Sequence, residues 1–80
     1  MAVRVRLFAA LRELAGASDV EVEAGDVAGV LSALSSRLGP RFDAIMATGS
    51  VIVNGEPVGV DRALAPGDEV ALLPPVSGGR

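Results

Sequence analysis

The sequence predicts an α+β fold, in which one main helix packs on one face of a mixed sheet of about five strands. Short segments with strand-like apolar patterns recur along the chain, and one longer segment, residues 26–38, has helical spacing. The chain has 80 residues, of which 50% are hydrophobic, so it can form one small core. We therefore expect one domain over residues 1–75, followed by a flexible C-terminal tail over residues 76–80.

The first predicted strand, residues 3–9, alternates strictly between two faces. Its aliphatic face is expected to point into the core, and its other face carries Arg4, Arg6 and Phe8. A short helical turn is predicted over residues 10–15, because these are good helix formers and Gly16 ends them.

The second predicted strand, residues 19–23, also alternates. If it pairs antiparallel with the first strand, Arg4 and Arg6 lie on the same face as Glu21 and Glu23. Cross-strand ion pairs of about 0.2–1 kcal/mol each are then the expected role of these charges, which form a solvated face.

The main helix is expected to begin after Asp26, a candidate N-cap, and to end at Gly39-Pro40. One stripe of this helix faces the sheet and consists of Val27, Val30, Leu31, Leu34 and Leu38. An irregular segment is predicted to come next. It should contribute three core residues, namely Phe42, Ile45 and Met46.

Three strands are predicted in the C-terminal part of the chain. Residues 51–53 form the first, Asn54-Gly55 makes a tight hairpin, and Pro57 marks an edge strand. Pro66-Gly67 then turns the chain into the last strand, residues 69–73. Alternation in that strand places Val70 and Leu72 on the core face and Ala71 and Leu73 on the other.

The helix covers only one face of such a sheet, so Phe8 and Leu73 are candidates for an exposed apolar patch on the other. Beyond the last strand, Pro74-Pro75 lack backbone N–H groups and make the chain leave the sheet in an extended form. Gly78-Gly79 have no side chains, so this tail could thread a narrow channel in another protein. A merely frayed chain end is the alternative.

Composition argues against an independent enzyme. The chain has no Cys, His, Lys, Tyr or Trp, so its serines have no base to activate them. Asp61, Asp68 and Glu69 lie in turn-like settings, where solvated carboxylates are the commoner case. No residues have metal-ligand spacing.

Charge and hydropathy exclude further classes. The net charge is −3, and no basic cluster sits beside aromatic residues, so we expect no nucleic-acid partner. Apolar runs are far shorter than the roughly 20 residues that span a bilayer, and no signal peptide is recognisable. We therefore expect a soluble, cytoplasmic protein with no membrane partner.

The order of elements and several motifs are similar to those of a known family. The motifs are Leu7-Phe8-Ala9, Arg12-Glu13-Leu14, Val53-Asn54-Gly55, Pro66-Gly67-Asp68-Glu69-Val70 and Pro74-Pro75-Val76-Ser77-Gly78-Gly79. Nearly end to end, the chain resembles the MoaD family, the small subunit of molybdopterin synthase. The pairing of a Gly-Asp-Glu-Val strand start with a Pro-Pro-Val-x-Gly-Gly ending is specific, whereas two glycines alone are not.

The resemblance implies a ubiquitin-like β-grasp fold and a non-catalytic role as sulfur carrier in molybdenum cofactor biosynthesis. In that family an ATP-dependent activating enzyme adenylates the carboxylate of the last glycine, which is then converted to a thiocarboxylate. The tail next enters the catalytic subunit of molybdopterin synthase and passes its sulfur to cyclic pyranopterin monophosphate. The implied partners are these two proteins. No cofactor is expected on the carrier, because the activating enzyme uses the ATP.

Carried onto this chain, the resemblance makes Gly79 the attachment point of the adenylate and the thiocarboxylate, within a reactive tail of Gly78 and Gly79. The residues that match a partner-binding patch are Phe8, Leu73, Arg12 and Pro75. Arg12 would be a polar contact to the activating enzyme, and a solvated helix charge explains it equally well.

Three features depart from the family pattern. Pro57 stands where an apolar interface residue is usual, and Leu72-Leu73 replaces a frequently aromatic pair. Arg80 comes after Gly79, whose carbonyl is therefore an amide and not the carboxylate that adenylation needs. Either a protease removes Arg80, or Arg80 is a remnant of expression, or the chain does not carry sulfur.

Two other functions stay open. A carrier of the same type could serve thiazole or cysteine synthesis, because the fold does not fix the acceptor. The Pro-Pro-Val-Ser-Gly-Gly ending favours molybdopterin synthase over these pathways. A ubiquitin-like modifier or interaction module would use the patch of Phe8 and Leu73 and, without Lys, could not form chains on itself.

Overall fold

Five strands and three helices follow one another along residues 1–75, the part of the chain that this computed structural model describes. The strands are β1 (Ala2–Leu7), β2 (Asp19–Glu23), β3 (Ser50–Val53), β4 (Glu56–Val58) and β5 (Val70–Leu73), and the helices are α1 (Ala9–Ala15), α2 (Val27–Leu38) and α3 (Pro40–Met46). The predicted tail, residues 76–80, lies outside the described residues.

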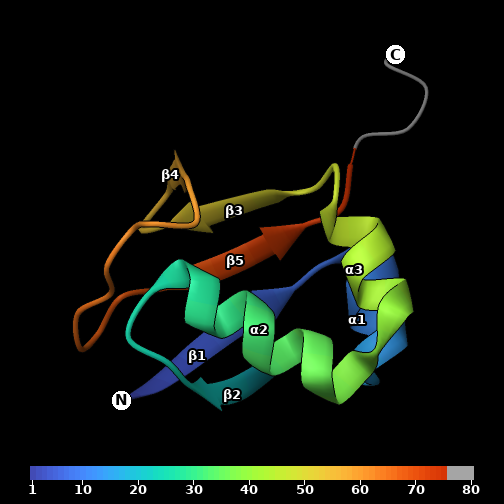
Figure 1. Ribbon diagram of the computed structural model, residues 1–80, viewed down its shortest axis with the longest axis horizontal. Helices are drawn as coiled ribbons and strands as arrows, with labels where there is room; N and C mark the ends of the chain where they lie inside the picture. The colour runs from blue at the N-terminus through green and yellow to red at the C-terminus, as the bar shows by residue number, and fades with distance from the viewer. Residues whose placement is uncertain (76–80) are drawn as a thin grey trace.

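The strands form one mixed sheet in the order β2-β1-β5-β3-β4. β1 and β5 run parallel, and the other three pairs are antiparallel. The long helix α2 crosses one face of this sheet, with α1 and α3 at the end where β5 finishes (Figure 1). The predicted mixed sheet with one main helix on one face is confirmed.

The core lies between the sheet and the helices, and strict alternation builds its sheet side. In β1 every second residue is buried, and in β5 the same holds for Val70 and Leu72. The fully buried large side chains come from nearly all elements: Val5, Leu7, Leu11, Val27, Val30, Leu34, Phe42, Val53, Val70 and Leu72. Both faces assigned from the sequence to β1 and β5 are therefore confirmed.

The helix α2 begins as its sequence predicts. The Asp26 carboxylate accepts a 2.7 Å hydrogen bond from the backbone N–H of Gly29 and so caps the first turn. Val27, Val30 and Leu34 of its apolar stripe are buried, and the helix ends at Gly39. The apolar spacing thus predicts the buried face correctly.

The segment after Gly39 is the helix α3, so the prediction of an irregular segment was wrong. Pro40 occupies the first turn of this helix, where its fixed φ suits the helix and its missing N–H costs nothing. The prediction that Phe42 is a core residue is confirmed, since only 1% of its surface is exposed. Pro40 therefore both ends α2 and starts α3.

The charged face of β1 and β2 differs in one respect from its prediction. The strands pair antiparallel and Arg4 and Arg6 share a face with Glu21 and Glu23, as expected. Arg4 lies opposite Glu21 and Arg6 opposite Asp19, and Glu23 binds the N-terminal ammonium group at 3.1 Å. Within residues 1–75 no ion pair joins these arginines to β2 carboxylates. Exposed charges gain little from pairing, because water already solvates both partners.

Candidate functional site

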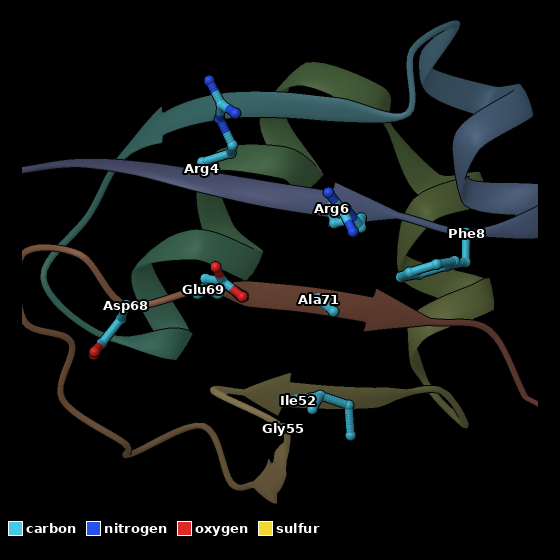
Figure 2. A pocket seen from close by; sticks show the side chains of 9 residues that line it. Arg4, Arg6, Phe8, Ile52, Gly55, Asp68, Glu69 and Ala71 are labelled. Carbon is cyan, nitrogen blue, oxygen red and sulfur yellow. The ribbon is translucent and has the colours of Figure 1, made fainter.

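The face of the sheet opposite α2 is open and carries a continuous row of side chains across four strands. Arg6 of β1 lies opposite Ala71 of β5, Ala71 opposite Ile52 of β3, and Ile52 opposite Pro57 of the edge strand β4. Figure 2 shows Arg6, Ala71 and Ile52 side by side on this face, with α2 behind the sheet. We call this surface the open face.

The open face is hollowed to about 310 Å³ between β1, β5 and β3. Its lining is part apolar and part charged and includes Arg4, Arg6, Phe8, Ile52, Glu69 and Ala71. A surface that combines apolar side chains with charges of both signs suits a protein partner more than a small ligand.

Phe8 lies at the end of the open face where the chain leaves the sheet. Leu7 pairs with Leu72, so in the parallel register the next residues, Phe8 and Leu73, are neighbours at the ends of β1 and β5. Phe8 is 36% exposed, Leu73 is half-buried and Pro75 is exposed. Three of the four residues assigned to the partner-binding patch therefore gather at the root of the tail.

The backbone of Phe8 explains why an aromatic side chain is held outside the core. Phe8 has extended dihedrals, φ −125° and ψ 151°, and is the N-cap of α1. Its carbonyl accepts a 3.0 Å hydrogen bond from Leu11 N–H, while the Leu11 side chain is fully buried. The junction between strand and helix thus fixes Phe8 on the open face, and its role in binding stays a prediction.

Arg12 is exposed on α1 and does not line the hollow of the open face. Its predicted contact to an activating enzyme stays a prediction. The attachment point Gly79 and its neighbour Gly78 lie outside the described residues.

Sequence reasoning placed Ala71 on the outward face of the last strand, as the structure shows, but it assigned neither Ala71 nor Ile52 to a binding surface, although both lie in the middle of the open face. The signal was present in the alternation, because Ile52 stands between the core residues Val51 and Val53, and Ala71 stands between Val70 and Leu72. An apolar residue at an outward position of a central strand is the pattern that could have identified them.

The carboxylate of Asp68 is engaged in a local network that explains the Gly-Asp-Glu-Val motif. Asp68 accepts hydrogen bonds from the backbone N–H of Ala65 at 2.9 Å and from the side-chain amide of Asn54 at 3.0 Å. Its Oδ2 lies 3.9 Å from Nη2 of Arg62. These groups, the Ala65 N–H first, hold the pKa of the Asp68 carboxyl below its ordinary value. A carboxylate held in this way stabilises a turn and is poorly suited to take up a proton in catalysis.

The described part of the chain lacks other kinds of site. Residues 1–75 contain no cluster of three or more acidic, His or Cys side chains arranged to bind a metal ion. In the same residues, no helix has the length and apolarity needed to cross a membrane.

The fold and the open face at the root of the tail define a small ubiquitin-like β-grasp protein of the carrier type. The chain belongs to the ThiS family, whose model matches residues 5–79. The resemblance to the MoaD family is confirmed, since sulfur carriers of the MoaD/ThiS type are among its relatives. The chain is accordingly a small ubiquitin-like carrier or modifier and not an enzyme.

Two relatives are similar to nearly the whole chain. The molybdopterin synthase sulfur carrier subunit of Chlamydomonas reinhardtii is 39% identical, covering 99% of this chain and 100% of that protein. Small archaeal modifier protein 1 of Haloferax volcanii is 41% identical, covering 92% of this chain and 97% of that protein. The two names belong to different functions, so the similarity establishes a ubiquitin-like carrier or modifier.

Solved structures show the same division. Small archaeal modifier protein 1 of Methanosarcina acetivorans has a TM-score of 0.85 at 29% identity, covering 98% of this chain and 96% of that one. A chain of the BexX/CysO complex of Amycolatopsis orientalis has a TM-score of 0.79 at 26% identity, covering 96% of this chain and 99% of that one. A chain of the complex of subunits 1 and 2 of the molybdopterin-converting factor of Helicobacter pylori has a TM-score of 0.73 at 25% identity, covering 99% of this chain and 100% of that one. Two of these similar structures are therefore complexes with another protein.

Proposed function

We propose that this chain is the sulfur carrier subunit of molybdopterin synthase, and that Gly79 carries the sulfur as a thiocarboxylate. The observation that carries this proposal is the 39% identity, over essentially the full length of both chains, to a molybdopterin synthase sulfur carrier subunit. The Pro-Pro-Val-Ser-Gly-Gly ending supports it, since that ending favours this pathway over other acceptors.

The proposed chemistry needs a free carboxylate at Gly79, so Arg80 has to be removed first. A carboxylate oxygen of Gly79 then attacks the α-phosphorus of ATP, and pyrophosphate leaves. Sulfide sulfur attacks the carbonyl carbon of the resulting mixed anhydride, and AMP leaves. The activating partner supplies the catalytic groups and the ATP site, and the carrier binds no cofactor. Because activation consumes ATP, we place the chain in the cytoplasm.

The open face supports this role through its position. Phe8 and Leu73 lie at the root of the tail, so a partner that docks there holds the exit of the tail close to its own surface. Docking and insertion of the tail can therefore occur in one encounter. The catalytic subunit of molybdopterin synthase and the ATP-dependent activating enzyme are the two partners that would use this surface in turn.

Reconstitution of the product tests the pathway. Thiocarboxylated chain ending at Gly79 is mixed with the catalytic subunit of molybdopterin synthase and cyclic pyranopterin monophosphate. We expect molybdopterin, measured by fluorescence of its oxidised form, and none with unmodified carboxylate. A thiocarboxylate that forms but yields no molybdopterin with a catalytic subunit active on its own carrier would rule out this pathway.

A role as a protein modifier is the second candidate. The 41% identity to small archaeal modifier protein 1 favours it. In that case Gly79 would form an isopeptide bond with lysines of other proteins. Mass spectrometry of proteins from cells that express the tagged chain, with and without Gly79, would detect target lysines carrying the tail remnant only in the first.

A further inference from the structure

The segment between α3 and β3 touches the backbone of β5 at its last residue. Gly49 directly precedes β3, and its neighbour Ser50 pairs with Leu73. The N–H of Gly49 donates a 3.2 Å hydrogen bond to the Met46 carbonyl, which ties this glycine to the end of α3. Gly49 thus joins the helical layer to the exit of the chain from the sheet.

The space around Gly49 admits no side chain. A Cβ atom at this position would lie 2.6 Å from the Leu73 carbonyl oxygen, 3.0 Å from the Met46 sulfur and 3.3 Å from the Ile45 carbonyl oxygen. The sulfur can move with its flexible side chain, but the two carbonyl groups are backbone. Any residue other than glycine must therefore shift the backbone at this contact, either that of residue 49 itself or that of Leu73.

The Leu73 carbonyl belongs to the peptide bond that joins the sheet to Pro74. The rings of Pro74 and Pro75 fix φ at both residues, so few rotations remain that could absorb a change in the orientation of this peptide. The direction in which Pro75 leaves the domain accordingly depends on how closely Gly49 allows the Leu73 carbonyl to approach.

We propose that Gly49 is a positioning residue for the C-terminal tail. By presenting only its backbone to the Leu73 carbonyl, it sets the direction in which Pro74 and Pro75 leave the sheet, and with it the approach of Gly79 to the activating enzyme. This inference rests on the proposed activation of Gly79. In that step the carboxylate oxygen forms a bond to the α-phosphorus of ATP, and pyrophosphate leaves.

The substitution Gly49→Ala tests this role, with Gly25→Ala as the matched control. An added Cβ at Gly25 meets no atom within 4 Å, so this variant changes the same chemical group without a clash. Thermal unfolding first shows that each variant is folded. Adenylation of chains that end at Gly79 is then monitored through the pyrophosphate that ATP releases.

With Gly49→Ala as its substrate, the activating enzyme should show a kcat at least tenfold lower, while its KM for the carrier changes less than about threefold. The reason is that misplacement of a reacting group by about 1 Å can cost a hundredfold in rate. Gly25→Ala should match the wild type in both constants. A merely structural role would lower the unfolding temperature of the carrier and leave the kcat of the activating enzyme with the folded carrier unchanged. That result would overturn the proposal.

A second measurement separates failure of this inference from failure of the proposed function. In the full 80-residue chain, carbonyl-detected NMR reports the chemical shifts of Leu73 and Pro74 without any partner. Gly49→Ala should move both carbonyl signals, and Gly25→Ala neither. If no chain is adenylated but these signals move, the assigned function is wrong and the positioning is upheld. If they do not move, the positioning is wrong whatever the activity.

The variant Pro74→Ala covers the case in which Gly49→Ala does not fold. Residue 74 comes directly after the last strand, so its replacement leaves the sheet intact while it frees one φ angle of the exit. We expect a fall in kcat of at least threefold. An unchanged kcat would show that the direction set at Leu73 is not transmitted to Gly79, and would overturn the proposal.

Discussion

The side-chain amide of Asn54 donates a 3.0 Å hydrogen bond to the carboxylate of Asp68, across 14 residues of sequence. The amide oxygen of Asn54 also accepts a 2.9 Å hydrogen bond from the backbone N–H of Glu69. One side chain thus joins the hairpin between β3 and β4 to the entry of β5. The Asn-Gly and Gly-Asp-Glu-Val motifs are thus two halves of one structural unit.

Replacing Asn54 should destabilise the domain for two separable reasons. Asn54→Ala removes both side-chain hydrogen bonds. It also places alanine at φ +52°, a left-handed conformation that alanine tolerates less well than asparagine. We expect a loss of about 2–3 kcal/mol in the free energy of unfolding, measured with urea. Asn54→Gly keeps the backbone conformation and loses only the hydrogen bonds, so its loss should be smaller. Equal stability of Asn54→Ala and the wild type would contradict this assignment.

Acid should weaken the same unit. Because the pKa of Asp68 is lowered in the folded state, its contribution to stability is complete above the ordinary carboxyl pKa, near pH 4, and is lost as the pH falls through the lowered value. The free energy of unfolding should therefore decline below about pH 4. Asp68→Asn should be less stable at pH 7 and show a shallower decline. The matched control Glu13→Gln, on the exposed side of α1, should be about as stable as the wild type at pH 7.

The open face is expected to bind partners through Phe8. Phe8→Asp should leave the fold intact, because this side chain is 36% exposed, and should weaken binding to the activating enzyme at least tenfold, or about 1.4 kcal/mol. Val60→Asp is the matched control. Val60 is 57% exposed, and its carbonyl accepts a hydrogen bond from Ala28 at the start of α2. Equal affinities of Phe8→Asp and the wild type in a calorimetric titration would refute the assigned surface.

The helix α3 should be an essential part of the core. Phe42→Ala leaves a cavity where a fully buried ring stood, so the free energy of unfolding should fall by about 3–5 kcal/mol. Arg41→Ala changes the exposed neighbour in the same helix and should cost less than about 0.5 kcal/mol. A small effect of Phe42→Ala would mean that α3 does not pack as described.

The sequence pattern predicts most of the fold because each element is locally consistent. Strict alternation identifies the buried residues of β1 and β5, and Asp26 with its apolar stripe identifies α2. The helix α3 escaped prediction because Gly39-Pro40 is a strong stop signal, while Pro40 is equally suited to begin a new helix. A local stop signal ends one helix and carries no information about the conformation of the next segment.

The candidate site was less predictable than the fold because its geometry is made by contacts between distant residues. Phe8 stands out as an aromatic residue on the outward side of a strand, and the sequence alone singles it out. The position of Gly49 against Leu73 depends on the pairing of β3 with β5 and leaves no local signal. The same holds for Asn54 and Asp68. The sequence shows the motif that contains each residue, but it does not predict the hydrogen bond between them.

The intact mass of the chain ending at Gly79 tests the central claim most directly. The chain is incubated with the activating enzyme, ATP and sulfide, and its mass is compared with that of a chain that retains Arg80. We expect the first to gain the mass difference between sulfur and oxygen, located by fragmentation at Gly79, and the second to stay unchanged. An unchanged mass of the first chain, with an enzyme that converts its own carrier under the same conditions, would contradict the role of Gly79 as a sulfur carrier.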